Sequence, residues 1–399
     1  MLLPKLFSDL YKKRGGVVLI DHQGQKYICG NPNFNNPLTV KLLKKNLNWR
    51  LLINPDLAFP EAYVRGDIEI LNGTLLDFLN LTFENLGRGE INTYGYIYKK
   101  ILHIWRLLTN YNVPTKSKKD IKYHYDIGEE FYDLFLDNKH RQYSCAYFKN
   151  PEDSLEDAQQ NKINHIIKKL SLRPGDRVLD IGCGWGGLAF EIARQSQCVV
   201  TGISLSENQI EYCKKKAKEL KLDNQVNFEF CDYRNIKGKF QRIVSVGAFE
   251  HFGKKFYGKF FKRVKELLSD DGLSLLHTIG SVDKPGPIQP FIQKYIFPGG
   301  IIPSMSDMIK PIEASGLIIS DCETLIHHYD KTLKIWLERF TKNKNKVKSL
   351  YDQNFVRMWE FYLASCSATF KYRDLVVYQL QLIKDFTAPP SNRRDYIYS

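Results

Sequence analysis

A glycine-rich stretch after an acidic residue is the sharpest chemical signal in the sequence. Residues 178–187 read Val-Leu-Asp-Ile-Gly-Cys-Gly-Trp-Gly-Gly. Glycines let the backbone turn tightly and approach a ligand closely. A pyrophosphate site needs Gly-x-Gly-x-x-Gly, whereas the spacing here is Gly-x-Gly-x-Gly-Gly. Because Asp180 precedes the first glycine by two residues, the stretch suits a cationic ligand better than a phosphate.

A sulfonium cofactor fits these residues better than a dinucleotide does. S-adenosylmethionine has no phosphate and carries a sulfonium and an amino group. Within the stretch 200–209, the second predicted strand ends without the acidic residue that commonly holds ribose hydroxyls at a strand end. Gln209 is a candidate for those hydrogen bonds, and Ser206 is a candidate helix N-cap. The stretch 231–234, Cys-Asp-Tyr-Arg, offers polar and aromatic groups for an adenine ring.

Alternating strands and helices must position these residues. Apolar runs predict strands at 177–181, 198–203, 226–230, 242–246, 273–279 and 317–325. Three helices are predicted between them: one that begins at 188, one that follows the second strand and ends at 220, and one over 256–268. Regular alternation of this kind predicts an α/β fold, with a parallel sheet covered by helices on both faces.

The N-terminal part has a different pattern. Residues 17–20 and 26–29 flank a polar turn and predict a hairpin, and 74–86 has helical spacing after a capping Thr74. An amphipathic aromatic segment that includes Trp105 then runs into the basic stretch 114–119, a linker candidate. The predicted domains are 1–115 and 116–399.

Composition excludes several classes of protein. Of 399 residues, 43% are hydrophobic and 26% charged, which excludes a disordered chain. No apolar run approaches the roughly 20 residues of a membrane span, and no signal for export is expected at the N-terminus. Eight cysteines without a CxxC pair predict reduced thiols in a cytoplasm, and the adjacent His327 and His328 do not predict a metal site.

The net charge of +14 points to a polyanionic partner. Residues 1–120 hold 17 basic and 10 acidic side chains, so that 17 − 10 = +7 of the excess lies there. An anionic lipid surface and a nucleic acid both fit this charge. No helix-turn-helix, zinc-finger or aromatic-basic RNA-binding motif is present, which disfavours a nucleic-acid partner.

Seven ordered motifs make the chain resemble a known family. The sequence is similar to the cyclopropane-fatty-acyl-phospholipid synthases and the mycolic acid cyclopropane synthases. The resemblance implies a class I S-adenosylmethionine-dependent methyltransferase fold, Rossmann-like with a mostly parallel seven-stranded sheet, and a smaller N-terminal α+β lipid-binding domain. The motifs are 124–128, 142–148, 179–187, 202–209, 246–252, 276–280 and 294–300, with weaker matches at 61–63 and 66–69.

The resemblance also implies a set of site residues. Catalytic groups that hold a bicarbonate ion would be Cys145, Glu250, His277, the backbone of Ile279, and Tyr329. Cofactor-binding residues would be Tyr143, Ser144, Asp180, Gly182, Cys183, Gly184, Gly186, Ser204, Leu205, Gln209, Asp232, Tyr233 and Arg234. No metal is expected.

The implied reaction is methylene transfer from S-adenosylmethionine across a cis double bond of a phospholipid acyl chain, which closes a cyclopropane ring. A carbocation would lose a proton to the bicarbonate base in a site without water. We expect a homodimer bound peripherally to the inner face of the cell membrane through unsaturated, anionic phospholipid. The alternatives are a related methyltransferase that makes a methyl-branched lipid or N-methylates a small amine, and, from another class, a nucleic-acid-binding protein.

Overall fold

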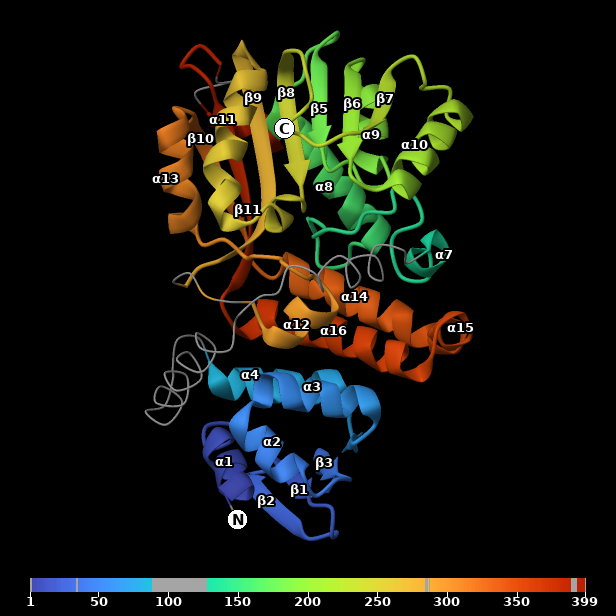
Figure 1. Cartoon of the computed structure of the whole chain (residues 1–399), viewed down its shortest axis with the longest axis vertical. Coiled ribbons are helices and arrows are strands. Elements are labelled where there is room, and N and C mark those ends of the chain that lie inside the picture. The colour runs from blue at the N-terminus through green and yellow to red at the C-terminus, as the bar shows by residue number, and fades with distance from the viewer. Residues whose placement is uncertain are drawn as a thin grey trace. The chain divides into compact units, whose positions relative to one another are not determined.

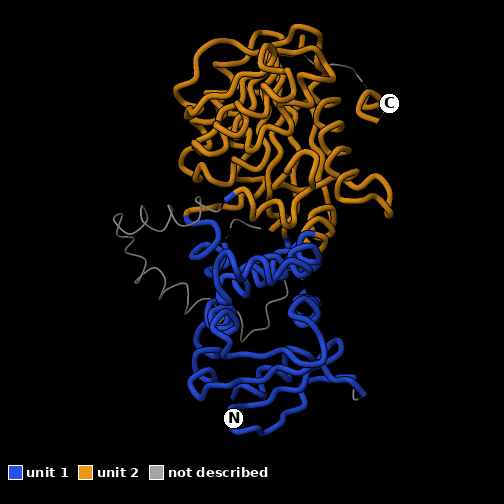
Figure 2. Tube along the Cα trace, turned by 90° about the vertical axis from the view of Figure 1, so that its right-hand side faces the viewer, with its two compact units in different colours: residues 1–128, 288–298, 336–374 blue, residues 129–287, 299–335, 375–399 orange. Residues whose placement is uncertain are grey.

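The computed structural model describes residues 2–33, 35–87, 128–283, 286, 288–388 and 393–398. The chain divides into two compact units, coloured separately in Figure 2. Unit 1 holds residues 1–128, 288–298 and 336–374, and unit 2 holds 129–287, 299–335 and 375–399. None of the helices in the described ranges is both long and apolar enough to cross a membrane.

Unit 1 contains a four-stranded sheet in the order β2-β1-β3-β4. The expected hairpin is confirmed, since β1 pairs antiparallel with β2. Thr74 caps α4 in a capping box with Asp77, as its position before an apolar helix predicts. The strands are β1 (Gly16–Ile20), β2 (Lys26–Gly30), β3 (Thr39–Leu42) and β4 (Ile68–Leu71), and the first helices are α1 (Leu2–Leu10), α2 (Leu47–Ile53), α3 (Pro55–Arg65) and α4 (Leu75–Leu86).

Three later helices also belong to unit 1, which differs from the division predicted at residue 115. They are α12 (Pro290–Tyr295), α15 (Lys344–Leu350) and α16 (Gln353–Tyr372), and α14 (His328–Lys342) runs through both units. Arg357 of α16 donates to the Tyr63 carbonyl of α3 at 2.8 Å, and the rings of Tyr63 and Phe361 pack together. The boundary itself, the Trp105 segment and the 114–119 linker lie outside the described residues.

Unit 2 is built on a seven-stranded sheet in the order β10-β11-β9-β8-β5-β6-β7 (Figure 1). The five strands from β9 to β7 run parallel, and β11 is antiparallel to both neighbours, which confirms the predicted methyltransferase fold. The strands are β5 (Arg177–Ile181), β6 (Val199–Ser204), β7 (Val226–Phe230), β8 (Phe240–Val246), β9 (Leu268–Ser281), β10 (Ile318–Leu325) and β11 (Leu375–Ile383).

Helices cover both faces of this sheet because successive strand residues point to opposite faces. On one face Val178, Val244 and Leu275 pack with buried residues of α8, α9 and α10. On the other face Leu179 and Ile243 pack with α11 and α13. The helices of unit 2 are α7 (Glu129–Tyr132), α8 (Leu155–Leu170), α9 (Gly187–Ser196), α10 (Glu207–Glu219), α11 (Tyr257–Leu267), α13 (Met305–Ser315) and α17 (Asp395–Tyr398), with short turns η1 (Phe249–His251) and η2 (Lys254–Phe256).

A buried arginine fixes the end of α8 against the sheet. Arg242 of β8 donates from Nε to the Leu170 carbonyl at 2.6 Å and from Nη2 to the Ser171 carbonyl at 2.9 Å. The Asp176 carboxylate lies 3.7 Å from the same Nη2. The last carbonyls of a helix lack partners within the helix, and Arg242 supplies them.

We expect the substitution Arg242→Met to destabilise unit 2 by about 3 kcal/mol, because it leaves two buried carbonyls without their donor and removes the cation beside the Asp176 carboxylate. Thermal unfolding followed by circular dichroism measures this as a loss of several degrees. The control is Arg177→Met, which removes an exposed guanidinium that lies over the Phe240 ring. Equal losses in the two variants would contradict the role given to Arg242.

Candidate active site

The glycine turn joins β5 to α9 at the carboxyl edge of the sheet. The N–H groups of Gly182 and Cys183 donate to the Ile203 carbonyl of β6 at 2.9 and 3.0 Å. Gly186 precedes α9 with φ +79°, and a Cβ there would collide with the Phe190 ring at 2.9 Å. At Gly184, also at positive φ, a Cβ would meet no atom within 4 Å. The turn is therefore packed on its inner side and open at Gly184.

Asp180 is a buried carboxylate just before this turn. Its Oδ2 has no hydrogen-bond partner among the described residues. Burial raises the pKa of Asp180 to about 7, and the nearby Lys162 ammonium opposes that rise. Lys162 is fully buried on α8, and burial lowers its pKa to about 8. The two groups partly compensate each other's charge beneath the glycine turn.

The ends of β6 and β7 carry further predicted cofactor residues. Ser204 donates to the Gln209 side-chain oxygen at 2.8 Å, and Ser206 caps α10, as predicted for a capping serine. Leu205 is exposed. After β7, Arg234 pairs with Asp232 and lowers the pKa of that carboxyl.

Aromatic rings line two parts of the predicted cofactor region. The Tyr233 ring packs against Phe252 at 4.8 Å and against Phe260 at 5.4 Å between centroids. The Tyr143 ring lies edge-on to Tyr132 at 5.3 Å. Cys183, in the glycine turn, is buried beside Cys213, and its pKa is raised by that neighbour and by burial.

Glu250 is the buried carboxylate of the predicted catalytic set. It lies in η1, which follows β8, and its Oε1 accepts the Ile279 N–H at 2.6 Å. Its Oε2 is buried and has no hydrogen-bond partner among the described residues. Burial raises the pKa of Glu250, although the hydrogen bonds it accepts oppose that rise. One carboxylate oxygen is thus fixed and the other remains available to a ligand.

His277 lies two residues before Ile279 on β9, on the same face of the strand. The Gln379 amide of β11, in its assigned orientation, donates to the His277 Nδ1 at 3.1 Å. Burial and the positive charges of Lys162 and Lys169 hold the pKa of His277 well below 6.5. His277 is therefore a neutral imidazole with its proton on Nε2.

Cys145 and Tyr329 come from two segments that are bonded together. The N–H of Ala146 donates to Thr332 Oγ1 at 3.1 Å, and the N–H of Phe148 donates to His328 Nδ1 at 3.1 Å. These bonds hold the segment 142–148 against the first turn of α14, which begins beside Tyr329. Both Cys145 and Tyr329 are buried, and burial raises the pKa of the Cys145 thiol far above its ordinary value.

The structure thus brings some of the predicted residues together and leaves others apart. Glu250, His277 and Ile279 meet at the ends of β8 and β9, and Lys162 lies close enough to Cys145, Asp180 and His277 to act on the pKa of each. Tyr329 and Cys145 lie on two segments, 142–148 and the first turn of α14, that hydrogen bonds hold together. Leu205 and the Asp232–Arg234 pair are the more exposed members of the set.

Sequence reasoning missed three buried polar residues that support this site: Gln159, Lys162 and Gln379. All three are fully buried. The available signal was the i, i+3 spacing of Gln159 and Lys162 on the side of α8 that packs inward, where an amphipathic helix normally places apolar residues. Within the described ranges, no group of three His, Cys, Asp or Glu side chains lies together as metal ligands would.

Comparisons with known proteins match this architecture. The sequence pattern of the family described as Mycolic acid cyclopropane synthetase covers residues 113–380. The chain is 36% identical over 351 residues to the cyclopropane-fatty-acyl-phospholipid synthase of Escherichia coli, covering 87% of this chain and 88% of that protein. It is 33% identical over 286 residues to the cyclopropane mycolic acid synthase MmaA2 of Mycobacterium tuberculosis, covering 68% and 99%.

Solved structures agree. The structure of MmaA2 from Mycobacterium tuberculosis superposes with a TM-score of 0.63 at 32% identity, over 66% of this chain and 97% of that one. The mycolic acid cyclopropane synthase CmaA1, complexed with SAH and CTAB, gives the same TM-score, identity and coverage. The chain therefore belongs to the mycolic acid cyclopropane synthetase family of S-adenosylmethionine-dependent methyltransferases.

Proposed function

We propose that this protein transfers a methylene group from S-adenosylmethionine across a cis double bond of an unsaturated phospholipid acyl chain, forming a cyclopropane ring. The observation that carries the proposal is the Glu250 carboxylate, buried at the edge of the methyltransferase sheet. One of its oxygens is fixed by Ile279, and the other has no partner in the part of the chain that the structure describes. The match over 87% of the chain to a protein named for this activity supports it.

The cofactor would lie over the glycine turn. Gly184 is open to a ligand there, and Gln209, oriented by Ser204, would bind ribose hydroxyls. The aromatic wall at Tyr233 would pack against adenine. When bound, S-adenosylmethionine supplies an electrophilic methyl group on a sulfonium.

A small oxyanion with one hydroxyl, such as bicarbonate, fits the groups around Glu250. Glu250 Oε2 is a buried acceptor that needs a donor, and neutral His277 offers the Nε2–H as a donor. Glu250, His277, Tyr329 and Cys145 would hold the ion, which when bound would supply the base for the methyl proton.

The surrounding residues would keep the reaction free of side products. An alkene attacked by a methyl group becomes a cation, which water would capture as an alcohol. Burial of Glu250, His277 and Cys145 excludes water from their surroundings. Because burial keeps Cys145 as a thiol rather than a thiolate, it does not compete with the alkene for the electrophilic methyl group.

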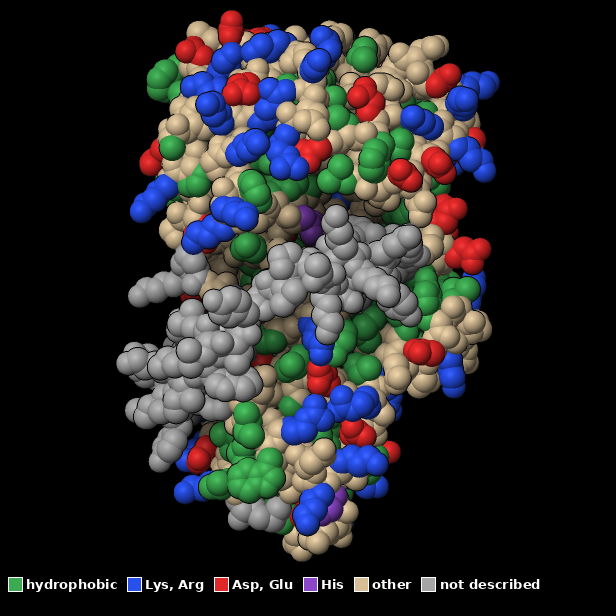
Figure 3. All heavy atoms as spheres, in the orientation of Figure 1, with side chains coloured by type: hydrophobic (Ala, Val, Ile, Leu, Met, Phe, Trp, Pro, Cys, Tyr) green, Lys and Arg blue, Asp and Glu red, His purple; other side chains and the backbone are tan. Residues whose placement is uncertain are grey.

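We further propose that unit 1 docks on an anionic phospholipid surface. Trp49 and Ile53 are 65% and 59% exposed on one face of α2, and Leu2 and Leu6 are exposed on α1, which packs against α2. Figure 3 shows hydrophobic side chains on the surface over α1. Exposed Lys44 and Lys45 lie just before α2. Exposed apolar side chains beside cations are typical of peripheral membrane binding.

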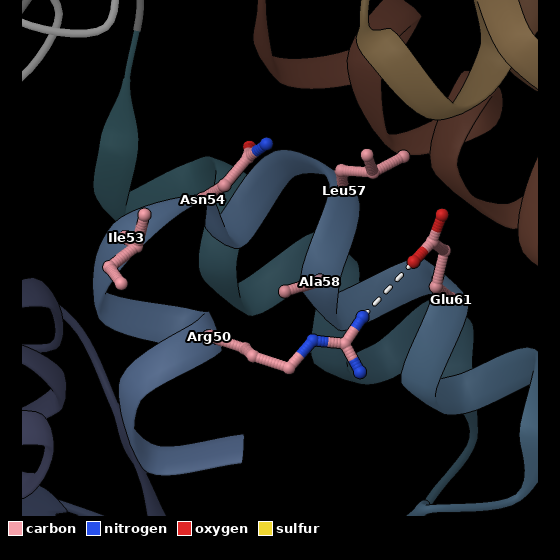
Figure 4. Close-up of a pocket in the computed structure, with 6 residues that line it drawn as sticks. All are labelled: Arg50, Ile53, Asn54, Leu57, Ala58 and Glu61. Carbon is pink, nitrogen blue, oxygen red and sulfur yellow. Dashed lines mark hydrogen bonds and ion pairs between the residues drawn. The ribbon is translucent and has the colours of Figure 1, made fainter. Parts of the chain in front are cut away.

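A cavity of about 170 Å³ lies beside this face of α2 (Figure 4). Its walls combine apolar side chains with the Arg50–Glu61 ion pair, which is 3.1 Å long. Arg65 and Lys294 also pair with Glu61, so three cations share one carboxylate. The net positive charge would favour a headgroup phosphate. The homodimer and the location at the inner face of the cell membrane stay predictions.

The purified protein, given methyl-labelled S-adenosylmethionine and vesicles of cis-unsaturated phospholipid, is expected to place label in the lipid. Mass spectrometry should show one added CH2 and loss of the hydrogenatable double bond, whereas a methyl-branched product or a methylated amine would support the alternatives.

We expect Glu250→Gln to lose about 100-fold or more in kcat, since it removes an acceptor at the base site. Glu219→Gln, at an exposed ion pair, is the control. Full activity of Glu250→Gln would contradict the assignment.

The neutrality of His277 predicts a pH dependence of stability. Its folded-state pKa lies well below 6.5, so below pH 6.5 the unfolded chain takes up a proton that the folded chain does not. Stability should therefore fall with falling pH, by about 1.4 kcal/mol per unit from this group. Urea unfolding of the wild type and His277→Gln should show a weaker pH dependence in the variant between about pH 7.5 and about pH 5.5. Identical slopes would show that His277 is not held neutral.

The double substitution Trp49→Ser and Ile53→Ser is expected to weaken co-sedimentation with anionic vesicles by about tenfold or more, because each side chain contributes apolar burial at the membrane. Phe386→Ser, which removes a 78% exposed ring from unit 2, should leave binding unchanged. Unaltered binding of the double variant would show that another surface docks.

A further inference from the structure

Helix α8 buries polar side chains where packing alone would favour apolar ones. Gln159 and Lys162 are both 0% exposed and lie three residues apart, on the same side of the helix. Removing an amide and an ammonium from water is unfavourable unless both find partners. Their partners therefore show what this side of α8 does.

Both side chains bond to the segment 142–144. Lys162 Nζ donates to Gln142 Oε1 at 2.6 Å and to Ser144 Oγ at 2.7 Å. Gln159 Nε2 donates to the Ser144 carbonyl at 3.0 Å and to the Gln142 carbonyl at 3.5 Å. One helix face thus fixes a side-chain oxygen and the backbone carbonyl of both Gln142 and Ser144, the residues on either side of Tyr143.

The rest of this segment is held just as firmly. The N–H of Tyr147 donates to the Ala158 carbonyl of α8 at 3.0 Å. The Tyr147 ring stacks on His165 at 4.4 Å and on His328 at 4.9 Å between centroids. Residues 142–147 are therefore fixed between α8 and the first turn of α14, with Cys145 in the middle.

We propose that Gln159 and Lys162 are positioning residues that hold Tyr143, Ser144 and Cys145 in place for the cofactor and the base site. The inference rests on the proposed function, since it takes the roles of those three residues from it. An apolar pair at these positions would satisfy packing, but it would remove the four hydrogen bonds that join the segment 142–144 to α8. Asp180 lies close enough to offset the positive charge of Lys162 near a sulfonium.

Lys162→Met is expected to lower kcat/KM by about 100-fold, the effect of misplacing reacting groups by about 1 Å. It should also weaken S-adenosylmethionine binding, measured by calorimetry. The control is Arg242→Met, which removes another buried cation, one that bonds to the Leu170 and Ser171 carbonyls rather than to the segment 142–144. Both variants should lose thermal stability, but only Lys162→Met should lose cofactor affinity and turnover.

A double-mutant cycle separates positioning from general destabilisation. If Lys162 acts through Ser144, then Ser144→Ala and Lys162→Met should be non-additive in kcat/KM, with the double variant close to Lys162→Met alone. Additive losses, or equal losses of activity in Lys162→Met and Arg242→Met, would overturn the inference. A different outcome would separate the two proposals. If the wild type does not act on unsaturated phospholipid but binds the cofactor, and Lys162→Met weakens that binding, the proposed function is refuted and the positioning role is retained.

Discussion

The hydrogen bond from the Ile279 N–H to Glu250 is the interaction on which the site depends. It ties the turn after β8 to β9, and it satisfies one oxygen of a carboxylate that is otherwise in a dry environment. A buried carboxylate with one free oxygen is unfavourable in a folded protein unless a ligand completes it. Neutral His277 on the same strand face supplies the complementary donor. These few groups make up the centre of the candidate site.

The parallel part of the fold could be predicted because its strands are short apolar runs between helices. The glycine turn, the cap at Ser206 and the strands up to β10 are local features, which short-range sequence patterns can predict. β11 was missed because it returns late in the chain and inserts between β9 and β10, antiparallel to both. That placement is a property of long-range pairing, which no window of sequence contains.

The supporting residues were missed for a related reason. Lys162 and Gln159 read as ordinary polar positions on a helix, and only their partners at 142–144 show that they face inward. The division of the chain into units also depends on contacts between residues far apart in the sequence. Helices α12, α15 and α16 belong to unit 1 with the N-terminal strands, although they lie between segments of unit 2 in the sequence. Motif resemblance supplied the candidate reacting groups, whereas three-dimensional contacts showed the buried polar groups that bond to the segments carrying them.

The claim that Glu250 and His277 form a site for a small oxyanion is tested most directly by carbon NMR of labelled bicarbonate titrated with the protein. The account predicts a protein-dependent shift or broadening of the bicarbonate resonance that disappears in Glu250→Gln. A resonance unchanged by the wild-type protein, or changed equally by the variant, would contradict it.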